Sequence, residues 1–175
     1  MSEPEEQALA PIDLEWETDE APEELRRLIL FQACDEWFGL PLEWVREIQP
    51  LEGVTRVPNA PAEILGILNL RGRVLTLFDL AGCLGIPPGT QPNTHAVVLD
   101  FADPEINVGL AAQQIAQVRG VPVSALEPPP REGSLGVLEG VFELEGKVVG
   151  VLDLPRVFAR ALPEWGVALQ MRGAG

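Results

Sequence analysis

The residues of this chain that could carry out acid–base chemistry are Asp79, Asp153 and His95. Two carboxylates and an imidazole can transfer protons when they converge in one pocket, and an enzyme built on these groups would need that convergence. Each aspartate, however, directly precedes a short apolar run, one beginning at Leu80 and the other at Leu154. A carboxylate in that position accepts hydrogen bonds from the first N–H groups of a helix. We therefore expect two helix caps and an incidental histidine, with no catalytic residue and no enzyme.

The two cysteines, Cys34 and Cys83, are the candidates for redox or metal chemistry. Two cysteines are too few for a disulfide framework. A zinc site would need more ligands than these cysteines and the single His95 supply. Both cysteines lie in apolar or amphipathic runs, where small buried side chains with free thiols are expected. The sequence therefore predicts no metal site and no cofactor.

The composition describes a strongly acidic globular chain of 175 residues, with 46% hydrophobic residues, 22% charged residues and a formal net charge of −15. That length suits one domain or two small packed domains. Phosphate backbones and anionic membranes repel such a chain, so nucleic-acid binding would need a basic groove that the sequence does not predict. The acidic start lacks a signal-peptide pattern, and no apolar run is long enough to cross a bilayer. We expect a cytoplasmic location without membrane insertion.

The elements that would position functional residues follow a pattern that occurs twice in the sequence. Several positions recur 74 residues later: Gly66 with Gly140, Gly72 with Gly146, and Asp79 with Asp153. An earlier stretch recurs 70 residues later: Phe31 with Phe101, Gly39 with Gly109, and Leu40 with Leu110. Both stretches hold short apolar runs separated by Gly and Pro, which is typical of small closed or nearly closed β-barrels. We predict a mainly β fold of two related subdomains with short helices.

The distribution of charged residues and prolines predicts how the chain divides into an arm, folded subdomains and a tail. Residues 1–24 hold ten acidic residues, three prolines and no Lys or Arg, which favours a disordered, solvated arm. A short recognition motif around Ile12, Leu14 and Trp16 is the alternative. The expected parts are an acidic arm at 1–24, subdomains at about 25–90 and 91–162, and a tail at 163–175.

Short-range signals predict individual elements. Residues Glu43–Ile48 can form a helical turn that projects Trp44 and Glu47 outward. Two apolar runs joined at Arg71-Gly72 predict a hairpin. The segment Ile86–Thr94, rich in proline, is expected to be a linker between the two copies.

The most specific motifs of the chain are F-G-L-P-L-E-W-V-R-E-I at 38–48, V-P-N-A-P at 57–61 and G-I-L-N-L-R-G at 66–72. They closely resemble the CheW family of chemotaxis coupling proteins, and weaker matches extend the resemblance over about residues 27–160. The resemblance implies a CheW-like domain at 25–162 that consists of two five-stranded SH3-like β-barrels packed together.

The same resemblance implies a function in signal transduction. Members of the family are non-enzymatic adaptors without a cofactor. They link the cytoplasmic tips of chemoreceptors to the regulatory domain of the histidine kinase CheA, so this chain would be recruited to membrane-associated receptor arrays. An adaptor of the same family for another array, in twitching motility or a polar partition system, is the alternative.

The resemblance also implies which residues bind partners. Glu47 and Arg71 match family positions needed for receptor coupling, and we expect a surface ion pair that shapes a docking site. The alternative is an ordinary exposed pair, worth about 0–1 kcal/mol. Val45 matches a position linked to kinase and receptor contact, although a core position would explain it equally well. Glu145 takes the place of Arg71 in the second copy, so the two barrels should present different surfaces.

Gly66, Gly109 and Trp44 complete the expected partner-binding set. The two glycines match family positions at which substitution disturbs function. Close approach of two backbones, or a positive φ angle, would explain them without any partner. Trp44 is expected either as an exposed interface anchor or as a side chain half-buried against the barrel.

Overall fold

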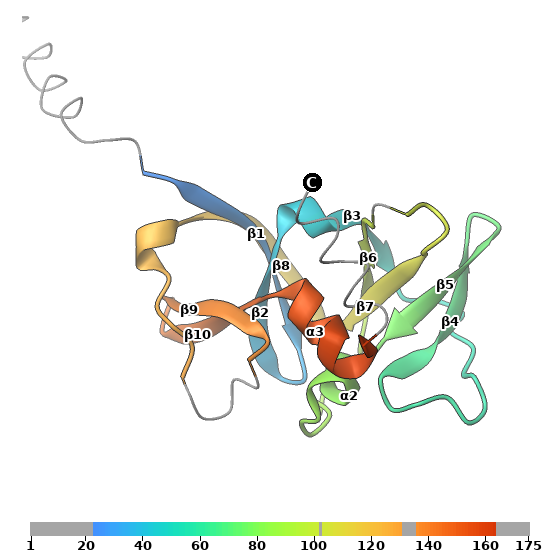
Figure 1. Ribbon diagram of the computed structural model, residues 1–175. Helices are drawn as coiled ribbons and strands as arrows, with labels where there is room; N and C mark the ends of the chain where they lie inside the picture. The colour runs from blue at the N-terminus through green and yellow to red at the C-terminus, as the bar shows by residue number, and fades with distance from the viewer. Residues whose placement is uncertain (1–22, 102, 131–135, 164–175) are drawn as a thin grey trace, which may run out of the picture.

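The computed structural model describes residues 23–101, 103–130 and 136–163. Within these residues the chain forms ten β-strands and two short α-helices, which confirms the predicted mainly β class. Figure 1 shows the strands gathered into two groups that lie side by side, with the helices between them. The expected acidic arm and C-terminal tail lie almost entirely outside the described residues, as does the motif around Trp16.

Each group is a five-stranded sheet. In sheet A the spatial order is β8 (Gln114–Pro122), β1 (Leu25–Ala33), β2 (Glu36–Pro41), β10 (Lys147–Leu152) and β9 (Leu138–Leu144). In sheet B the order is β3 (Val45–Pro50), β6 (His95–Leu99), β7 (Val108–Ala112), β5 (Arg73–Phe78) and β4 (Ile64–Leu70). Sheet A lies on the left of Figure 1 and sheet B on the right.

The two sequence copies exchange their first hairpins. Strands β1 and β2 of the first copy join β8, β9 and β10 of the second copy, whereas β6 and β7 join β3, β4 and β5. The exchange is made through two parallel pairs in equivalent registers: Leu77 of β5 lies opposite Gly109 of β7, and Val151 of β10 lies opposite Gly39 of β2. Each copy therefore completes the sheet of the other.

The expected division into subdomains at 25–90 and 91–162 does not follow the sheets, because each sheet takes strands from both ranges. The apolar patterns of the two copies are equivalent, so a hairpin can bury its apolar face equally well in either sheet. A sequence pattern detects the copies but does not reveal which sheet each hairpin joins.

A single bridge brings the two outer strands of each sheet together. In sheet B the chain beyond β3 pairs Thr55 with Ile67 of β4, and both N–H to O distances are 2.8 Å. In sheet A the chain beyond β8 pairs Glu127 with Val141 of β9 in the same way. We call the meeting of β3 with β4, and of β8 with β9, the seam of each sheet. The seams bring both sheets close to the expected closed barrels.

Apolar side chains fill three clusters. The largest lies between the sheets and includes Phe31, Phe78 and Phe158. Smaller clusters fill the interior of each sheet. The helices α2 (Leu80–Leu84) and α3 (Leu154–Ala161) pack on the largest cluster, where the Phe158 ring meets the Phe78 ring edge-on at 5.1 Å.

Both helices begin at the aspartates that the sequence singled out. An Asp79 carboxylate oxygen accepts a hydrogen bond from Ala81 N at 3.3 Å, and an Asp153 oxygen accepts one from Arg156 N at 3.2 Å. Gly85 ends α2 with a φ of 67°, a conformation that favours glycine. The predicted caps are confirmed, because they depend only on neighbouring residues.

The helical turn predicted at Glu43–Ile48 is wrong for most of its length. A 3₁₀ turn, η2, covers only Leu42–Trp44, and β3 begins at Val45 because the following residues pair with β6. Trp44 is 7% exposed and belongs to the cluster between the sheets. The outward projection expected for Trp44 is therefore wrong, since packing between the sheets draws this large apolar ring inward.

Candidate functional site

Glu47 and Arg71 form an ion pair on the surface of sheet B. Arg71 Nη1 donates to Glu47 Oε2 and Arg71 Nη2 donates to Glu47 Oε1, both at 2.8 Å. This is the two-pronged geometry that a guanidinium and a carboxylate prefer. The Arg71 side chain remains 68% exposed and that of Glu47 is 22% exposed. The expected surface pair is therefore present, with the cation on the solvent side.

The pair spans the seam of sheet B. Glu47 lies on β3, and Arg71 begins the turn between β4 and β5, where Arg71 and Gly72 have φ angles of 53° and 81°. Two successive positive φ angles are typical of the tight turns that suit hairpins. Since β3 and β4 are opposite edges of the sheet, the ion pair adds a second link beside the bridge of Thr55.

Hydrogen bonds fix the charge state and the orientation of the pair. The bond from Arg71, followed by one from Gln49, lowers the pKa of Glu47. The bond to Glu47 raises the pKa of Arg71. A guanidinium has five N–H donors, and Glu47 takes two of them. The arrangement can present an oriented cation with further donors to a carboxylate or carbonyl of a partner.

Val45 lies two residues before Glu47 at the start of β3. Its side chain is half-buried and packs against the cluster between the sheets. A register shift in the pairing of β3 with β6 falls between Val45 and Glu47. The sequence left open whether Val45 is a core residue or a partner contact. Its position allows both, since it packs against the core and remains partly accessible two residues from Glu47.

The structure does not bring Gly66, Gly109 or Trp44 to the surface. A Cβ at Gly66 would lie 2.5 Å from the Thr55 carbonyl oxygen, and a Cβ at Gly109 would lie 3.1 Å from that of Val97. Neither glycine has a positive φ angle. Close approach of backbones therefore explains both glycines, and burial explains Trp44. The two glycines let strands of sheet B approach closely, and Trp44 packs between the two sheets.

The seam of sheet A carries different side chains on the same backbone. Glu145 and Gly146 have φ angles of 53° and 77° and form the turn equivalent to Arg71-Gly72. Gln117 takes the place of Glu47, so this seam holds an amide and a carboxylate that cannot form a salt bridge with each other. Lys147 Nζ lies 4.9 Å above the centre of the Trp37 ring. The expected difference between the two surfaces is present in the structure.

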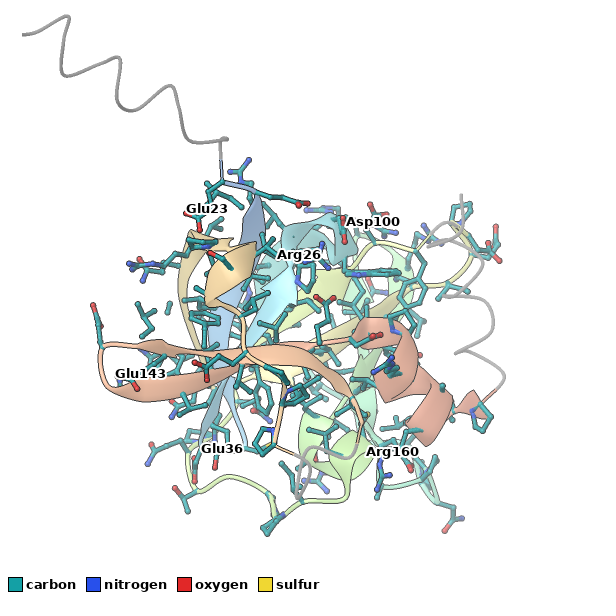
Figure 2. All side chains as sticks on the ribbon, turned by 60° about the vertical axis from the view of Figure 1, so that its left-hand side comes forward. Glu23, Arg26, Glu36, Asp100, Glu143 and Arg160 are labelled. Atoms are coloured by element: carbon teal, nitrogen blue, oxygen red, sulfur yellow. The ribbon has the colours of Figure 1, made fainter. Side chains whose placement is uncertain are left out.

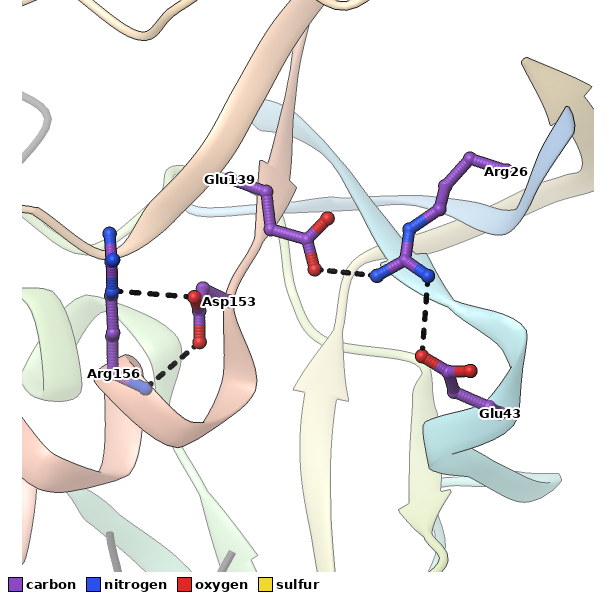
Figure 3. Close-up of polar contacts among 5 residues, drawn as sticks. All are labelled: Arg26, Glu43, Glu139, Asp153 and Arg156. Carbon is purple, nitrogen blue, oxygen red and sulfur yellow. Dashed lines mark hydrogen bonds and ion pairs between the residues drawn. The ribbon is translucent and has the colours of Figure 1, made fainter. Parts of the chain in front are cut away.

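A three-residue cluster at the other end of sheet A is absent from the sequence predictions. Arg26 of β1 donates to Glu139 of β9 at 2.7 Å and to Glu43 of η2 at 3.4 Å (Figure 3). Burial acts to lower the pKa of Arg26, but the hydrogen bonds and charges of Glu139 and Glu43 together outweigh it and raise the pKa overall. The partners lie 113 and 17 residues away in sequence, and no local pattern joins them.

The candidates for catalysis do not converge. Asp79 and Asp153 cap different helices, and His95 Nδ1 lies 2.8 Å from the hydroxyl of Thr94. Burial raises the pKa of the Cys34 and Cys83 thiols to about 12, so neither is a ready nucleophile.

The described part of the chain contains no cluster of three Cys, His, Asp or Glu side chains that could hold a metal ion. Among its helices, none has the length and apolar character required to cross a membrane. Charged side chains such as Glu23, Asp100, Glu143 and Arg160 lie at the periphery of the molecule (Figure 2).

Comparisons with known proteins agree with this geometry. The family model described as a CheW-like domain matches residues 27–162. The chemotaxis protein CheW of Helicobacter pylori is 41% identical over 141 residues, which cover 79% of this chain and 84% of that protein. A probable chemotaxis protein CheW of Rhizobium etli is 28% identical over 142 residues, covering 79% of this chain and 91% of the relative.

A solved structure shares the fold. The scaffolding protein TtCheW of Thermoanaerobacter tengcongensis superposes with a TM-score of 0.65 at 23% identity, covering 77% of this chain and 88% of its own. The two five-stranded sheets, the repeated turns and the matched residues 27–162 lead to one conclusion. The chain belongs to the CheW-like domain family.

Proposed function

We propose that this protein is a non-catalytic scaffold of chemotaxis signalling, which couples chemoreceptors to the regulatory domain of the histidine kinase CheA. The observation that carries the proposal is the oriented Glu47–Arg71 pair at the seam of sheet B, in a chain of the CheW-like family. The protein would be cytoplasmic and recruited to membrane-associated receptor arrays. It would need no cofactor and would not bind nucleic acid.

The docking surface proposed for the receptor is the exposed Arg71 together with the accessible part of Val45. Arg71 would donate to oxygens of the receptor tip, and Val45 would supply apolar contact. Gly66, Gly109 and Trp44 would act indirectly, because they fix the backbone and the core beneath this surface. Different side chains at the seam of sheet A would leave that sheet free to meet a second partner.

Coupling would operate through a shift of populations. A scaffold that binds receptor and kinase together fixes the position of the kinase domain relative to the receptor. A receptor movement then changes the balance between active and inactive kinase only if the two conformations interact differently with the scaffold.

A capture assay with immobilised receptor-tip fragment, and separately with the CheA regulatory domain, tests the proposal. Arg71→Glu should weaken receptor capture about tenfold, which corresponds to roughly 1.4 kcal/mol, while the thermal midpoint stays nearly unchanged. Val45→Met should weaken capture of at least one partner. Glu145→Arg, which changes the equivalent turn of sheet A, is the matched control and should retain receptor capture. Full receptor binding by Arg71→Glu would refute the docking role.

An adaptor for a different array, in twitching motility or a polar partition system, is the second candidate. It would use the same fold and the same surface, since the family is shared. Capture of kinase regulatory domains from several signalling systems by the 175-residue chain distinguishes the two. Selective binding of a kinase outside chemotaxis would favour the second candidate.

A further inference from the structure

The linker between α2 and β6 is held by a polar cluster that the proposed function does not use. One carboxylate oxygen of Asp35 accepts from the backbone N–H of Thr90 at 2.7 Å and from its hydroxyl at 2.9 Å. Asp35 lies in the turn between β1 and β2 of sheet A, with a φ of 62°. A single side chain therefore ties the linker to the tip of a hairpin that is 55 residues away in sequence.

Gln113, which lies between β7 and β8, is the third member of this cluster. Its side-chain oxygen accepts from Asp35 N at 2.8 Å, and its amide nitrogen donates to the other Asp35 oxygen and to Gln91 O, both at 2.9 Å. Gln113 is 7% exposed and lies between β7 of sheet B and β8 of sheet A. Its amide is fully used, so the cluster joins the linker, the β1–β2 turn and the passage between the sheets.

Residues of the linker line two cavities. One is a mostly apolar cleft of about 560 Å³ that includes Trp37 and Pro87 in its lining. The other is a polar cavity of about 460 Å³ that includes Arg56 and Asn93. Because Cys34 and Pro88 line both, they form part of the wall between them.

The fit of the linker against the cluster is tight. A Cβ at Gly89 would lie 2.2 Å from Gln113 Nε2 and 2.9 Å from an Asp35 oxygen. Only a residue without a side chain allows this approach. The close contact at Gly89 and the hydrogen bonds at Thr90 and Gln91 therefore act on neighbouring residues of one short segment, Ile86–Gln91.

We propose that Ile86–Gln91 is a releasable strap, latched by Asp35 at Thr90 and by Gln113 at Gln91, whose release joins the two cavities into one groove between the sheets. The latch is closed when Asp35 is ionised, because both carboxylate oxygens accept hydrogen bonds. The bond from Thr90 N, followed by that from Gln113, lowers the pKa of Asp35 and keeps the latch closed at neutral pH. This inference does not depend on the proposed function.

The Cys34 thiol offers a direct measure of strap release, because it lines both cavities and is half-buried. Asp35→Asn keeps the size of the side chain and suits the left-handed backbone, but an amide must leave either Thr90 or Gln113 without its acceptor. In the 175-residue chain, thiol labelling of Cys34 should become about tenfold faster. The Thr90 amide should lose hydrogen-exchange protection, whereas Cys83, which is 2% exposed, should stay unlabelled.

A charge control is needed because burial and the charges of Asp79, Asp35 and Glu36 all raise the pKa of Cys34. Glu36→Gln removes one neighbouring charge without touching the latch; Glu36 lies at the exposed tip of the same hairpin (Figure 2). Labelling that is faster in Asp35→Asn than in Glu36→Gln, together with lost protection of the Thr90 amide in Asp35→Asn alone, supports the strap, since removal of a charge does not expose that amide. Equal rates in the two variants, with unchanged protection of Thr90, would overturn it.

Rapid labelling of Cys83 would reveal that Asp35→Asn unfolds the protein. In that case a second variant, Thr90→Val, tests the strap. Thr90→Val removes the hydroxyl donor and keeps the backbone donor, and the residue is exposed. It should speed labelling of Cys34 by a few-fold, with Cys83 still protected. A rate equal to that of the unaltered protein would count against the latch.

Discussion

The two seams of this protein have the same backbone and different chemistry. Arg71 and Glu145, which begin the two turns, both have a φ of 53°. The bridges at Thr55 and Glu127 occupy equivalent places, each within its own sheet. Only in sheet B does the turn residue form a two-pronged pair with the opposite edge, among the residues that the structure describes. Turn geometry and close packing are therefore common to both copies, whereas the exposed side chains are specific to each.

This contrast separates residues that make the fold from residues that face partners. Gly66 and Gly140 occupy equivalent places beneath the bridges, where a side chain would meet a carbonyl oxygen. Arg71 and Glu145 occupy equivalent places above them and carry opposite charges. Substitutions at the first kind of position should change stability, and those at the second kind should change binding.

A substitution at the bridge of sheet B should cost the most stability. In Gly66→Ala the new Cβ would lie 2.5 Å from Thr55 O, so the bridge must shift, and we expect a loss of roughly 1–3 kcal/mol in unfolding free energy. Gly140→Ala should cost less, because the corresponding distance to Glu127 O is 2.9 Å. Urea unfolding measures both variants.

The matched control for the glycines is Gly120→Ala. Its Cβ would meet no atom closer than 3.4 Å, and Gly120 has no positive φ angle. The control should remain close to the original stability. A Gly66→Ala protein as stable as this control would contradict the explanation by close approach.

The next effect tests whether binding depends on the pair or on its exposed cation. The double variant Glu47→Arg with Arg71→Glu can rebuild an ion pair across the seam but presents a carboxylate to solvent. We expect an unchanged thermal midpoint and receptor capture that stays about tenfold weaker, as for Arg71→Glu alone. Recovery of capture in the double variant would show that the pair matters only through the shape of the seam.

A smaller effect concerns the contact between β10 and β2 beside the Glu145 turn of sheet A. Lys147→Met removes the cation above Trp37 and keeps an unbranched apolar side chain. The expected loss is about 0.5–1 kcal/mol, the range for exposed cation–aromatic contacts. Lys147→Arg keeps the cation and should retain the unfolding midpoint in urea. A Met variant with the same midpoint would show that this contact does not stabilise sheet A.

The smallest expected effect is a difference in pH dependence between the seams. The folded-state pKa of Glu47 is lowered, first by its bond from Arg71. Its contribution to stability is therefore complete above the ordinary glutamate pKa and is lost as pH falls through the lowered value. The stability difference between the original chain and Glu47→Gln should be constant near neutral pH and shrink in acid.

The corresponding control is Gln117→Ala in sheet A, which removes no ionisable group. Its stability difference from the original chain should stay level over the same pH range. Thermal unfolding at a series of pH values measures both. If the stability difference between Gln117→Ala and the original chain also changed in acid, carboxylates other than Glu47 would be responsible for the pH dependence.

Short-range features of the fold were predictable from the sequence. Asp79 and Asp153 cap helices, and glycines follow the first residue of each seam turn, because these conformations depend on adjacent residues alone. The ion pair of Glu47 with Arg71 was anticipated through the family resemblance, since the two residues lie 24 positions apart. Their two-pronged geometry and the seam that they cross required the coordinates.

Features that depend on distant packing were missed or wrong. Trp44 was expected at or near the surface, but the second sheet covers it. The cluster of Arg26 with Glu43 and Glu139 joins three elements that no local pattern connects. The latch of Asp35 with Gln113 also joins residues 78 positions apart.

The repeated units, their turns, their caps and the apolar faces that must be buried each depend on a few adjacent residues, so they can be inferred from the amino-acid order. The exchange, in which β1 with β2 and β6 with β7 complete the sheet of the other copy, emerges only from packing in three dimensions. Equivalent hairpins fit either sheet by local pattern, so the choice depends on burial summed over the whole chain. That choice buries Trp44, builds the seams and sets Arg71 above one of them.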